Sequence, residues 1–200
     1  MTYVISDLHG YPLEKLKKLL KKATFSSDDF LYILGDIIDR NGDGGVGILL
    51  WLLEQVNVQL ILGNHEAMLL SCDFVFDEIT EDSINAISSE KIELLNNYML
   101  NGGNATLKAL RNLPKNTQQD ILDYLRDCPL YEAVTANEKD FILVHSGFNN
   151  FNKSKKSEIT HQMTYYGRGL NLMINIMTIL QQFSVTLRHL VTVKNIKAKL

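Results

Sequence analysis

Four short clusters of polar residues carry the side chains whose types and spacing could do chemistry. They are Asp7-Leu8-His9, Asp36 to Arg40, Asn64-His65-Glu66, and His145. Carboxylates and imidazoles together suit zinc, iron or manganese, and one carboxylate can bridge two ions. Two ions about 3.5–4 Å apart can clamp a phosphoryl group and activate water. The clusters therefore indicate a two-metal site for phosphoryl chemistry.

Each cluster has a simpler explanation when it is taken alone. Asp7-Leu8-His9 could form a turn, and Asp36 to Arg40 could form a loop ion pair. Asn64 could cap a helix, and His145 could be an ordinary histidine at a strand end. All four clusters nevertheless follow apolar segments and occur in one order, which favours the metal site over four coincidences.

The apolar segments before these clusters are short and rich in strand-forming residues. We expect strands over residues 3–6, 30–34, 58–62, 130–134 and 141–144. Helical spacing of apolar residues predicts a first helix that Pro12 opens. The same spacing predicts further helices over residues 46–56, 65–70, 106–113 and 117–127. Residues 77–100 are acidic and roughly helical, but less regular. This alternation predicts an α/β layered fold with a largely parallel sheet. The carboxyl ends of its strands would bring the clusters together.

Composition and charge narrow the class of protein. The 200 residues are 46% hydrophobic with a net charge of −3, which suits one globular domain without a basic nucleic-acid surface. No uncharged apolar stretch is long enough for a membrane span, and Leu170 to Val193 comes nearest. The same stretch shows no convincing polar and apolar faces, which disfavours a membrane-surface helix. Cys72 and Cys128 are too few for a disulfide framework, so we expect free thiols in a cytoplasmic protein.

The order of the clusters resembles the phosphoprotein-phosphatase branch of the calcineurin-like metallophosphoesterases. That branch includes bacterial serine/threonine phosphatases and symmetrical diadenosine tetraphosphatases. Asn101-Gly102-Gly103, followed by Thr106, is also similar to the bacterial members. The resemblance covers residues 3–149. It implies a layered α/β sandwich and a metal-dependent phosphoester hydrolase that is similar first to the serine/threonine phosphatases, acting on a phosphorylated protein or a small phosphoester.

The resemblance also implies a ligand set. Asp7, His9 and Asp36 would hold the first metal ion. Asp36 would bridge to a second ion, which Asn64 and His145 would also bind. The ions would be divalent, with manganese favoured and iron or zinc as alternatives. The implied mechanism is direct hydrolysis by a hydroxide that bridges the metals, without a phosphoenzyme.

The remaining roles follow from the same resemblance. His65 would be the general acid, and Asp39 would orient it. Arg40 would hold phosphate oxygens, which suits its planar guanidinium. Glu66 would be structural.

Two features depart from the family pattern. Protein phosphatases of this branch usually carry arginine before Gly-Asn-His-Glu, where this chain has Leu62, as dinucleotide hydrolases often do. The family also places a Gly-His pair late in the chain to complete the second metal site. Here only His161 and His189 remain, and neither follows glycine. A symmetrical dinucleoside tetraphosphatase and a non-catalytic relative therefore stay as alternatives.

The tail suggests an explanation for the missing pair. We expect residues 1–152 to form the metallophosphoesterase domain. The resemblance to the family stops after Asn152, so residues 153–200 form an aberrant tail. In a reading frame shifted by one base, Ser184 to His189 permits Gly-His-Thr-Pro-Thr, and Ile159 to Arg168 permits Tyr-Thr-Pro-Asp-Asp-Leu-Leu-Trp-Glu-Arg, similar to the family's segments. We hypothesise a one-base deletion between the codons for Gly147 and Ile159. The tail would then be out of frame, and the second metal would bind weakly.

Overall fold

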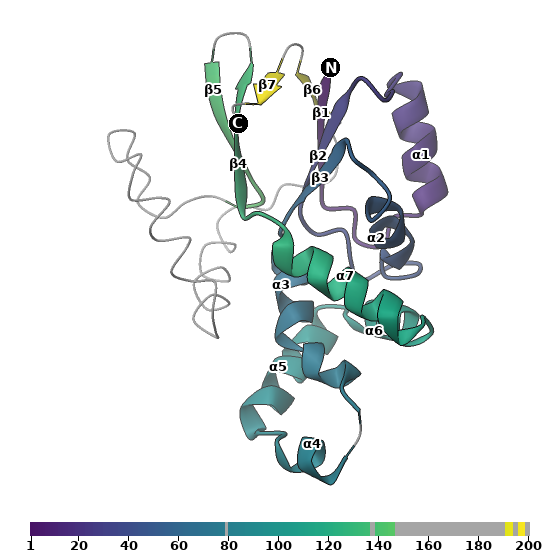
Figure 1. Cartoon of the computed structure of the whole chain (residues 1–200), viewed down its shortest axis with the longest axis vertical. Coiled ribbons are helices and arrows are strands. Elements are labelled where there is room, and N and C mark those ends of the chain that lie inside the picture. Colours follow the sequence, from purple (N-terminus) through teal and green to yellow (C-terminus); the bar gives the residue numbers. More distant parts are fainter. Residues whose placement is uncertain (79, 137–138, 147–190, 194–195, 199–200) are drawn as a thin grey trace, which may run out of the picture.

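The fold is described from a computed structural model of the chain. The structure describes residues 1–78, 80–136, 139–146, 191–193 and 196–198. These residues form two sheets, with helices on one side of the first sheet and beyond the ends of its strands (Figure 1).

The first sheet positions the polar clusters. Its three parallel strands are β1 (Thr2–Ser6), β2 (Phe30–Leu34) and β3 (Val58–Ile61), in the order β3-β2-β1. A short strand, β6 (Val191–Val193), pairs antiparallel with the free edge of β1. The predicted strands over 3–6, 30–34 and 58–62 are confirmed to within one residue. As expected, the carboxyl ends of β1, β2 and β3 meet at one edge of the sheet.

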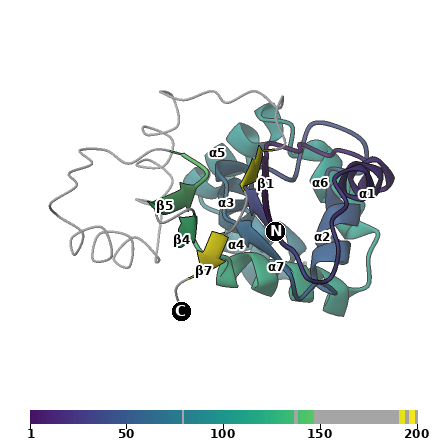
Figure 2. The ribbon, with the colours of Figure 1, turned by 90° about the horizontal axis from the view of Figure 1, so that it is seen from above.

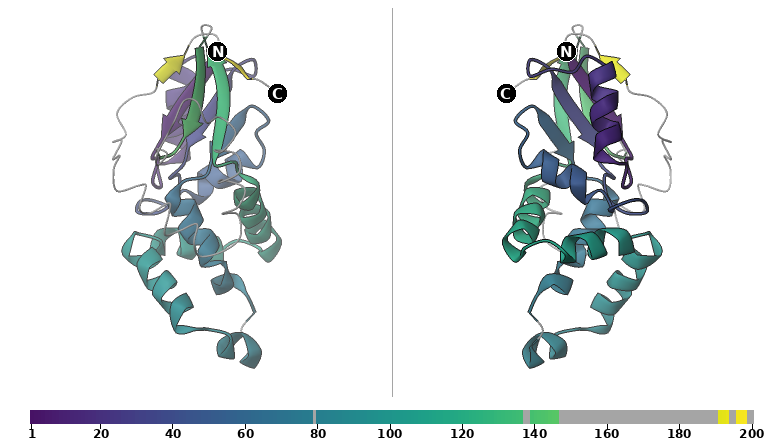
Figure 3. Two further views of the ribbon diagram at one scale, coloured as in Figure 1. Left: turned by 90° about the vertical axis from the view of Figure 1, so that its left-hand side faces the viewer. Right: turned by 90° about the vertical axis from the view of Figure 1, so that its right-hand side faces the viewer.

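One face of the first sheet is covered by helices. The helices α1 (Leu13–Lys22) and α2 (Val46–Leu52) lie on this face, as Figures 2 and 3 show. Leu16 of α1 and Leu49 of α2 are fully buried in the same core as Leu31 and Ile33 of β2. The predicted helix over 46–56 is shorter than expected, because α2 ends at Leu52 and a turn follows it.

The opposite face is covered by a β-hairpin. Its strands are β4 (Tyr131–Ala136) and β5 (Lys139–Val144), which pair antiparallel, with β7 (Ile196–Ala198) on the edge of β4. Val134 packs against Tyr32 and Ile61 of the first sheet, so both faces of β2 are buried. The expectation of a largely parallel sheet therefore holds for the first sheet only. The last two predicted strands are adjacent in the chain, and a hairpin joins such neighbours most simply when they are antiparallel.

The helices at the carboxyl edge of the sheet differ in detail from the prediction. They are α3 (Asn64–Ser71), a 3₁₀ turn η1 (Asp73–Phe76), α4 (Glu81–Asn85), α5 (Ser89–Leu100), α6 (Asn104–Arg111) and α7 (Lys115–Asp127). The acidic region expected to be one helical stretch over 77–100 is divided, because side-chain caps start new helices within it. The Thr80 hydroxyl accepts from the Ser83 N–H, and the Ser88 hydroxyl accepts from the Lys91 N–H.

Three other expectations concern the tail, the thiols and the membrane. Most of the tail proposed to be out of frame, including His161 and His189, lies outside the described residues. The described pieces 191–193 and 196–198 form β6 and β7, which were not predicted. Cys72 and Cys128 are free, as expected, and both are buried. Among the described residues, no helix has the length and apolar character needed to span a bilayer.

Candidate metal centre

The polar clusters meet at the carboxyl ends of β1, β2 and β3. The loop after β1 bonds to the loop after β2: the His9 N–H donates to the Asp36 carbonyl at 2.9 Å, and the Gly10 N–H donates to the Ile37 carbonyl at 2.8 Å. From the first turn of α3, which follows β3, the His65 N–H donates to Oδ1 of Asp36 at 3.1 Å. The Asp36 side chain is thus fixed where three chain segments converge.

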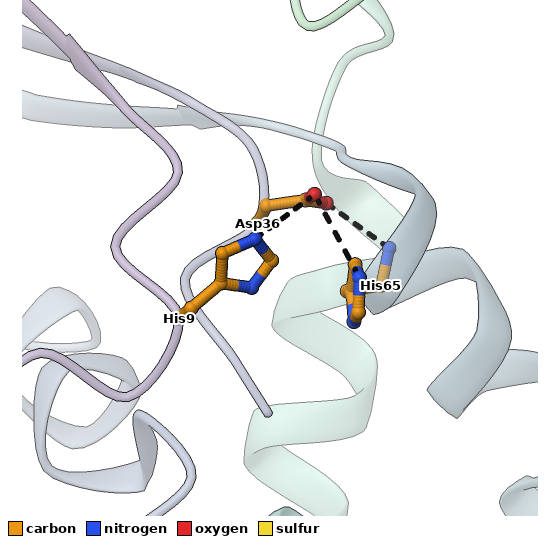
Figure 4. A group of neighbouring side chains, drawn as sticks. All are labelled: His9, Asp36 and His65. Atoms are coloured by element: carbon orange, nitrogen blue, oxygen red, sulfur yellow. Dashed lines mark hydrogen bonds and ion pairs between the residues drawn. The ribbon is translucent and has the colours of Figure 1, made fainter. Parts of the chain in front are cut away.

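Two groups of possible metal ligands share Asp36. His9, Asp36 and His65 form one group, and Asp7, Asp36 and His145 form the other, with one ligand atom per residue and all atoms of a group within 4.8 Å of one another. Figure 4 shows the imidazoles of His9 and His65 converging on the Asp36 carboxylate. Oδ2 of Asp36 lies 3.7 Å from Nε2 of His9, and Oδ1 lies 3.4 Å from Nε2 of His145. One carboxylate therefore offers an oxygen to each group, as a bridging ligand does.

The histidines are oriented as metal ligands usually are. Nδ1 of His9 lies 3.2 Å from the Ile38 carbonyl, and Nδ1 of His145 lies 2.7 Å from the Leu34 carbonyl. A carbonyl oxygen can only accept, so Nδ1 carries the hydrogen in both rings. Nε2 of each ring is then directed at Asp36. Metal-binding histidines commonly donate their second ring N–H in this way, which fixes the ring orientation.

Asn64 joins the second group through its amide. Its Oδ1 lies 3.1 Å from Nε2 of His145. With the amide reversed, its nitrogen would instead donate to Asp36 and His145, each at 3.1 Å. The first orientation gathers the amide oxygen, the Asp36 carboxylate and the imidazole nitrogen of His145 around one point. Such a set of oxygen and nitrogen ligand atoms fits a divalent cation.

Burial and charge shift the pKa values of these groups. Burial lowers the pKa of His9 below its ordinary value. Burial also opposes protonation of His145, but its hydrogen bond to Asp36 and the charge of that carboxylate outweigh burial and raise its pKa to about 9. Burial would raise the pKa of Asp36, yet its contacts with His145 and His65 lower it overall. Asp36 is therefore a carboxylate at neutral pH, able to bind a cation.

His65 lies between Asp39 and Arg40. Its Nδ1 is 2.7 Å from Oδ2 of Asp39, and its Nε2 is 3.1 Å from Nη2 of Arg40. Because a guanidinium only donates, Nε2 accepts here and Nδ1–H donates to the carboxylate. His65 and Asp39 are at most 1% exposed. A buried carboxylate behind an imidazole fixes its tautomer and can stabilise its protonated form, as in other acid–base sites.

Glu66 fixes the backbone of the loop after β2 through hydrogen bonds. Its buried carboxylate accepts from the backbone N–H groups of Asp36 at 2.9 Å, Ile37 at 2.8 Å and Gly63 at 3.0 Å. A weaker bond of 3.3 Å comes from Ile38. Burial and the charge of Asp36 raise the pKa of Glu66. These contacts support the structural role that the resemblance implies for Glu66.

The backbone of the site is strained and closely packed. Among the described residues, six non-glycine residues have positive φ, and five of these belong to the site: Asp7, His9, Asp36, Asp39 and Arg40. Residues in this region of the Ramachandran map cost about 1–3 kcal/mol each and cluster at functional sites. Gly63 allows the close approach, since a Cβ there would lie 2.4 Å from both N and Oδ1 of Asp36.

All eight residues predicted for the site lie together in the structure. The grouping of ligand atoms differs from the one that the resemblance implies, because Asp7 falls with His145, and His9 falls with His65. Sequence reasoning missed Tyr98, whose hydroxyl donates to Oδ1 of Asp39 at 2.7 Å. The only signal for it was its position three residues before Asn101-Gly102-Gly103.

Comparison with known proteins gives the family. The family described as calcineurin-like phosphoesterase matches residues 2–175. A symmetrical bis(5′-nucleosyl)-tetraphosphatase from Actinobacillus succinogenes is 31% identical over 151 residues, covering 74% of this chain and 44% of the relative. A symmetrical bis(5′-nucleosyl)-tetraphosphatase from Buchnera aphidicola is 32% identical over 99 residues, which cover 48% of this chain and 36% of the relative. The chain thus spans less than half the length of these curated relatives.

Solved structures add little to this assignment. A cold-active protein tyrosine phosphatase structure has 20% identity and a TM-score of 0.48, covering 83% of this chain and 47% of that one. A likeness of this size carries no argument about activity. The sequence match over residues 2–175, together with the site at the strand ends, shows that the chain belongs to the calcineurin-like phosphoesterase family.

Proposed function

We propose that this chain binds two divalent metal ions around Asp36 and hydrolyses a phosphoester. One observation carries the proposal: the two oxygens of a single buried carboxylate each lie within 4 Å of an imidazole from a different ligand group. As the family resemblance implies, Asp7 would join His9 at the first ion and Asn64 would join His145 at the second, which leaves His65 to act on the substrate. Manganese is the ion we favour, with iron or zinc as alternatives.

The bound ions would supply Lewis acidity for the phosphoryl group and for water. Residues of the chain would bind the phosphate oxygens and transfer the proton to the leaving oxygen. Arg40 would leave Nε2 of His65, 3.1 Å away, to bind phosphate oxygens through its guanidinium. Nε2 of His65 would then be free to carry a proton for the leaving oxygen. Asp39, 2.7 Å from Nδ1, would stabilise the charged ring.

We propose a symmetrical dinucleoside tetraphosphate as the first substrate to test. Two observations favour it over a phosphoprotein: the names of the relatives from Actinobacillus succinogenes and Buchnera aphidicola, and Leu62. Leu62 is half-buried against the core, so it offers an apolar side chain where protein phosphatases of the branch carry arginine. A phosphoserine peptide is the second candidate substrate. We place the reaction in the cytoplasm, where buried free thiols persist.

Hydrolysis of p-nitrophenyl phosphate by the Mn²⁺-loaded chain tests the general activity. We expect turnover that EDTA abolishes. For phenyl phosphate, whose leaving oxygen is more basic, His65→Asn should lower kcat at least about 100-fold, since it removes the general acid. Exposed Glu14→Gln is the matched control and should leave kcat unchanged. Equal rates in the parent and His65→Asn, or none in the parent, would contradict the proposal.

A non-catalytic relative is the rival from another class. It is supported by the absence of a late Gly-His pair from the sequence. Resequencing the gene between the codons for Gly147 and Ile159 separates the two readings. An additional base there would restore the pair and favour an active enzyme. An unchanged sequence would leave residues 1–200 without the Gly-His pair and would favour the non-catalytic relative with a weak second metal site.

A further inference from the structure

The carboxylate of Asp39 is held by more than its bond to His65. Its Oδ2 faces His65, while its Oδ1 accepts two further hydrogen bonds. The Tyr98 hydroxyl donates at 2.7 Å, and the Thr106 hydroxyl donates at 2.5 Å. All of Asp39, Tyr98 and Thr106 are fully buried. The buried carboxylate is therefore fixed on both oxygens by protein hydrogen bonds.

Thr106 also fixes the backbone of Asp39. Its Oγ1 accepts from the Asp39 N–H at 3.0 Å and lies 3.0 Å from the Gly44 carbonyl. A hydroxyl has one hydrogen, so Thr106 donates either to Asp39 or to Gly44 at a given moment. The shorter distance, to Asp39, favours the carboxylate. The side chain and main chain of Asp39 thus depend on the same hydroxyl group.

Tyr98 can act only as a donor to this carboxylate. Burial, and then the charge of Asp39, raise the pKa of Tyr98 well above its ordinary value. Its ring lies close against the backbone of Gly103, where an added Cβ would come within 2.6 Å of the ring. The Gly102 carbonyl accepts from the Arg40 N–H at 3.1 Å. One short segment at the junction of α5 and α6 therefore contacts both Asp39 and Arg40.

We propose that Tyr98 and Thr106 are positioning residues for the general acid, acting through Asp39 on His65. Their two hydrogen bonds hold Asp39 so that Oδ2 stays directed at Nδ1 of His65. This inference rests on the proposed function, because it assigns a purpose to the His65–Asp39 pair. It makes the α5–α6 segment, which supplies no metal ligand, a working part of the site.

Leaving-group dependence tests the proposal in the Mn²⁺-loaded chain. A general acid matters for phenyl phosphate, whose leaving oxygen is basic, and much less for p-nitrophenyl phosphate. We expect Tyr98→Phe to lower kcat for phenyl phosphate about 10-fold and Tyr98→Phe/Thr106→Val about 100-fold, by analogy with outer-shell partners. KM, Mn²⁺ affinity and kcat for p-nitrophenyl phosphate should change little. Thr106→Ser, which keeps the hydroxyl, should behave as the parent does.

Tyr3→Phe is the matched control. Tyr3 is also a buried tyrosine, and its hydroxyl donates to the Ala23 carbonyl at 2.7 Å, away from the site. If Tyr98→Phe lowered the rates for both substrates equally, or lowered them no more than Tyr3→Phe does, Tyr98 would be a purely structural residue and the proposal would be overturned.

A second readout decides the matter even if the parent is inactive. In the ¹⁵N-labelled chain, the Nδ1–H of His65 bonded to Asp39 should give a slowly exchanging proton resonance at low field. Tyr98→Phe should shift it and accelerate its exchange, and Tyr3→Phe should not. An inactive parent with this pattern would overturn the proposed function while supporting the positioning role. A resonance that Tyr98→Phe leaves unchanged would overturn the positioning role.

Discussion

Asp36 is the residue on which the site depends. It lies in the left-handed region, is 4% exposed, and contacts His9 from the loop after β1, His65 from α3 and His145 from the end of β5. Its place could be predicted from the sequence, because Gly35-Asp36 follows an apolar strand and recurs as a pattern with Gly63-Asn64. Which ligands group together could not be predicted, because it depends on side-chain directions that sequence spacing does not determine.

Glu66 gives the first prediction at this scale. Glu66→Gln keeps the shape but replaces one acceptor oxygen by an NH₂ group facing backbone N–H donors. We expect the free energy of unfolding to fall by about 2–4 kcal/mol, because buried donors lose their partners. Unfolding in urea measures this free energy, and the variant Glu54→Gln, at an exposed position, is the control. Equal stability of the two variants would show that the loop does not need Glu66.

Gly63 gives the second prediction at the residue scale. Gly63→Ala would place a methyl group 2.4 Å from N and Oδ1 of Asp36, so the Asp36 loop must move. We expect Mn²⁺ affinity to fall at least about 10-fold, since ligand geometry is displaced. Gly47→Ala is the control, because its Cβ would meet closely only the end of the Asp43 side chain. Similar Mn²⁺ titrations for both variants would argue against this close approach.

At the scale of elements, local sequence patterns predicted most of the strands and helices. The run Phe30 to Leu34 is apolar throughout because both faces of β2 are buried, one by helices and one by the hairpin. The pattern could not show that β4 and β5 pair with each other in a second sheet, because pairing is a long-range choice. The role of Tyr98 was hidden for a similar reason, since a tyrosine in a helix gives no sign of a buried carboxylate 59 residues away in the chain.

The ends of α3 and α7 give an element-scale prediction through their cysteines. Burial raises the pKa of Cys72 to about 11 and that of Cys128 to about 12. Both thiols should therefore react slowly with a disulfide reagent at pH 8 and rapidly in urea. Because the folded state keeps these protons longer, their contribution to stability should decline as pH rises from about 8.5 toward 11. Fast reaction of either thiol in the native protein would contradict this packing.

At the scale of the whole molecule, the site requires both sheets. The first sheet supplies Asp7, Asp36 and Asn64 from its strand ends, while His145 comes from the end of β5 in the hairpin. The ring of His145 is anchored to the first sheet by the Leu34 carbonyl at 2.7 Å. Formation of the second ligand group is thus coupled to docking of the hairpin.

Val134 tests this coupling. It is 2% exposed and packs against Tyr32 and Ile61. Val134→Ala removes two buried methyl groups, so the free energy of unfolding should fall by roughly 1–3 kcal/mol, with a weaker second metal site as hairpin docking loosens. Ile142→Val in β5 is the control, because Ile142 is 40% exposed and pairs with Ala133 rather than with Val134. Unchanged metal binding in Val134→Ala, at reduced stability, would show that His145 is placed independently of the hairpin packing.

Calorimetric titration of the parent chain and Asp36→Asn with Mn²⁺ tests the central claim most directly. The account predicts two ions per parent chain, the second bound more weakly. In Asp36→Asn both affinities should fall at least about 100-fold, because the shared carboxylate is lost. Matching titration curves for the two proteins, or a parent that binds no metal, would contradict a metal centre built on Asp36.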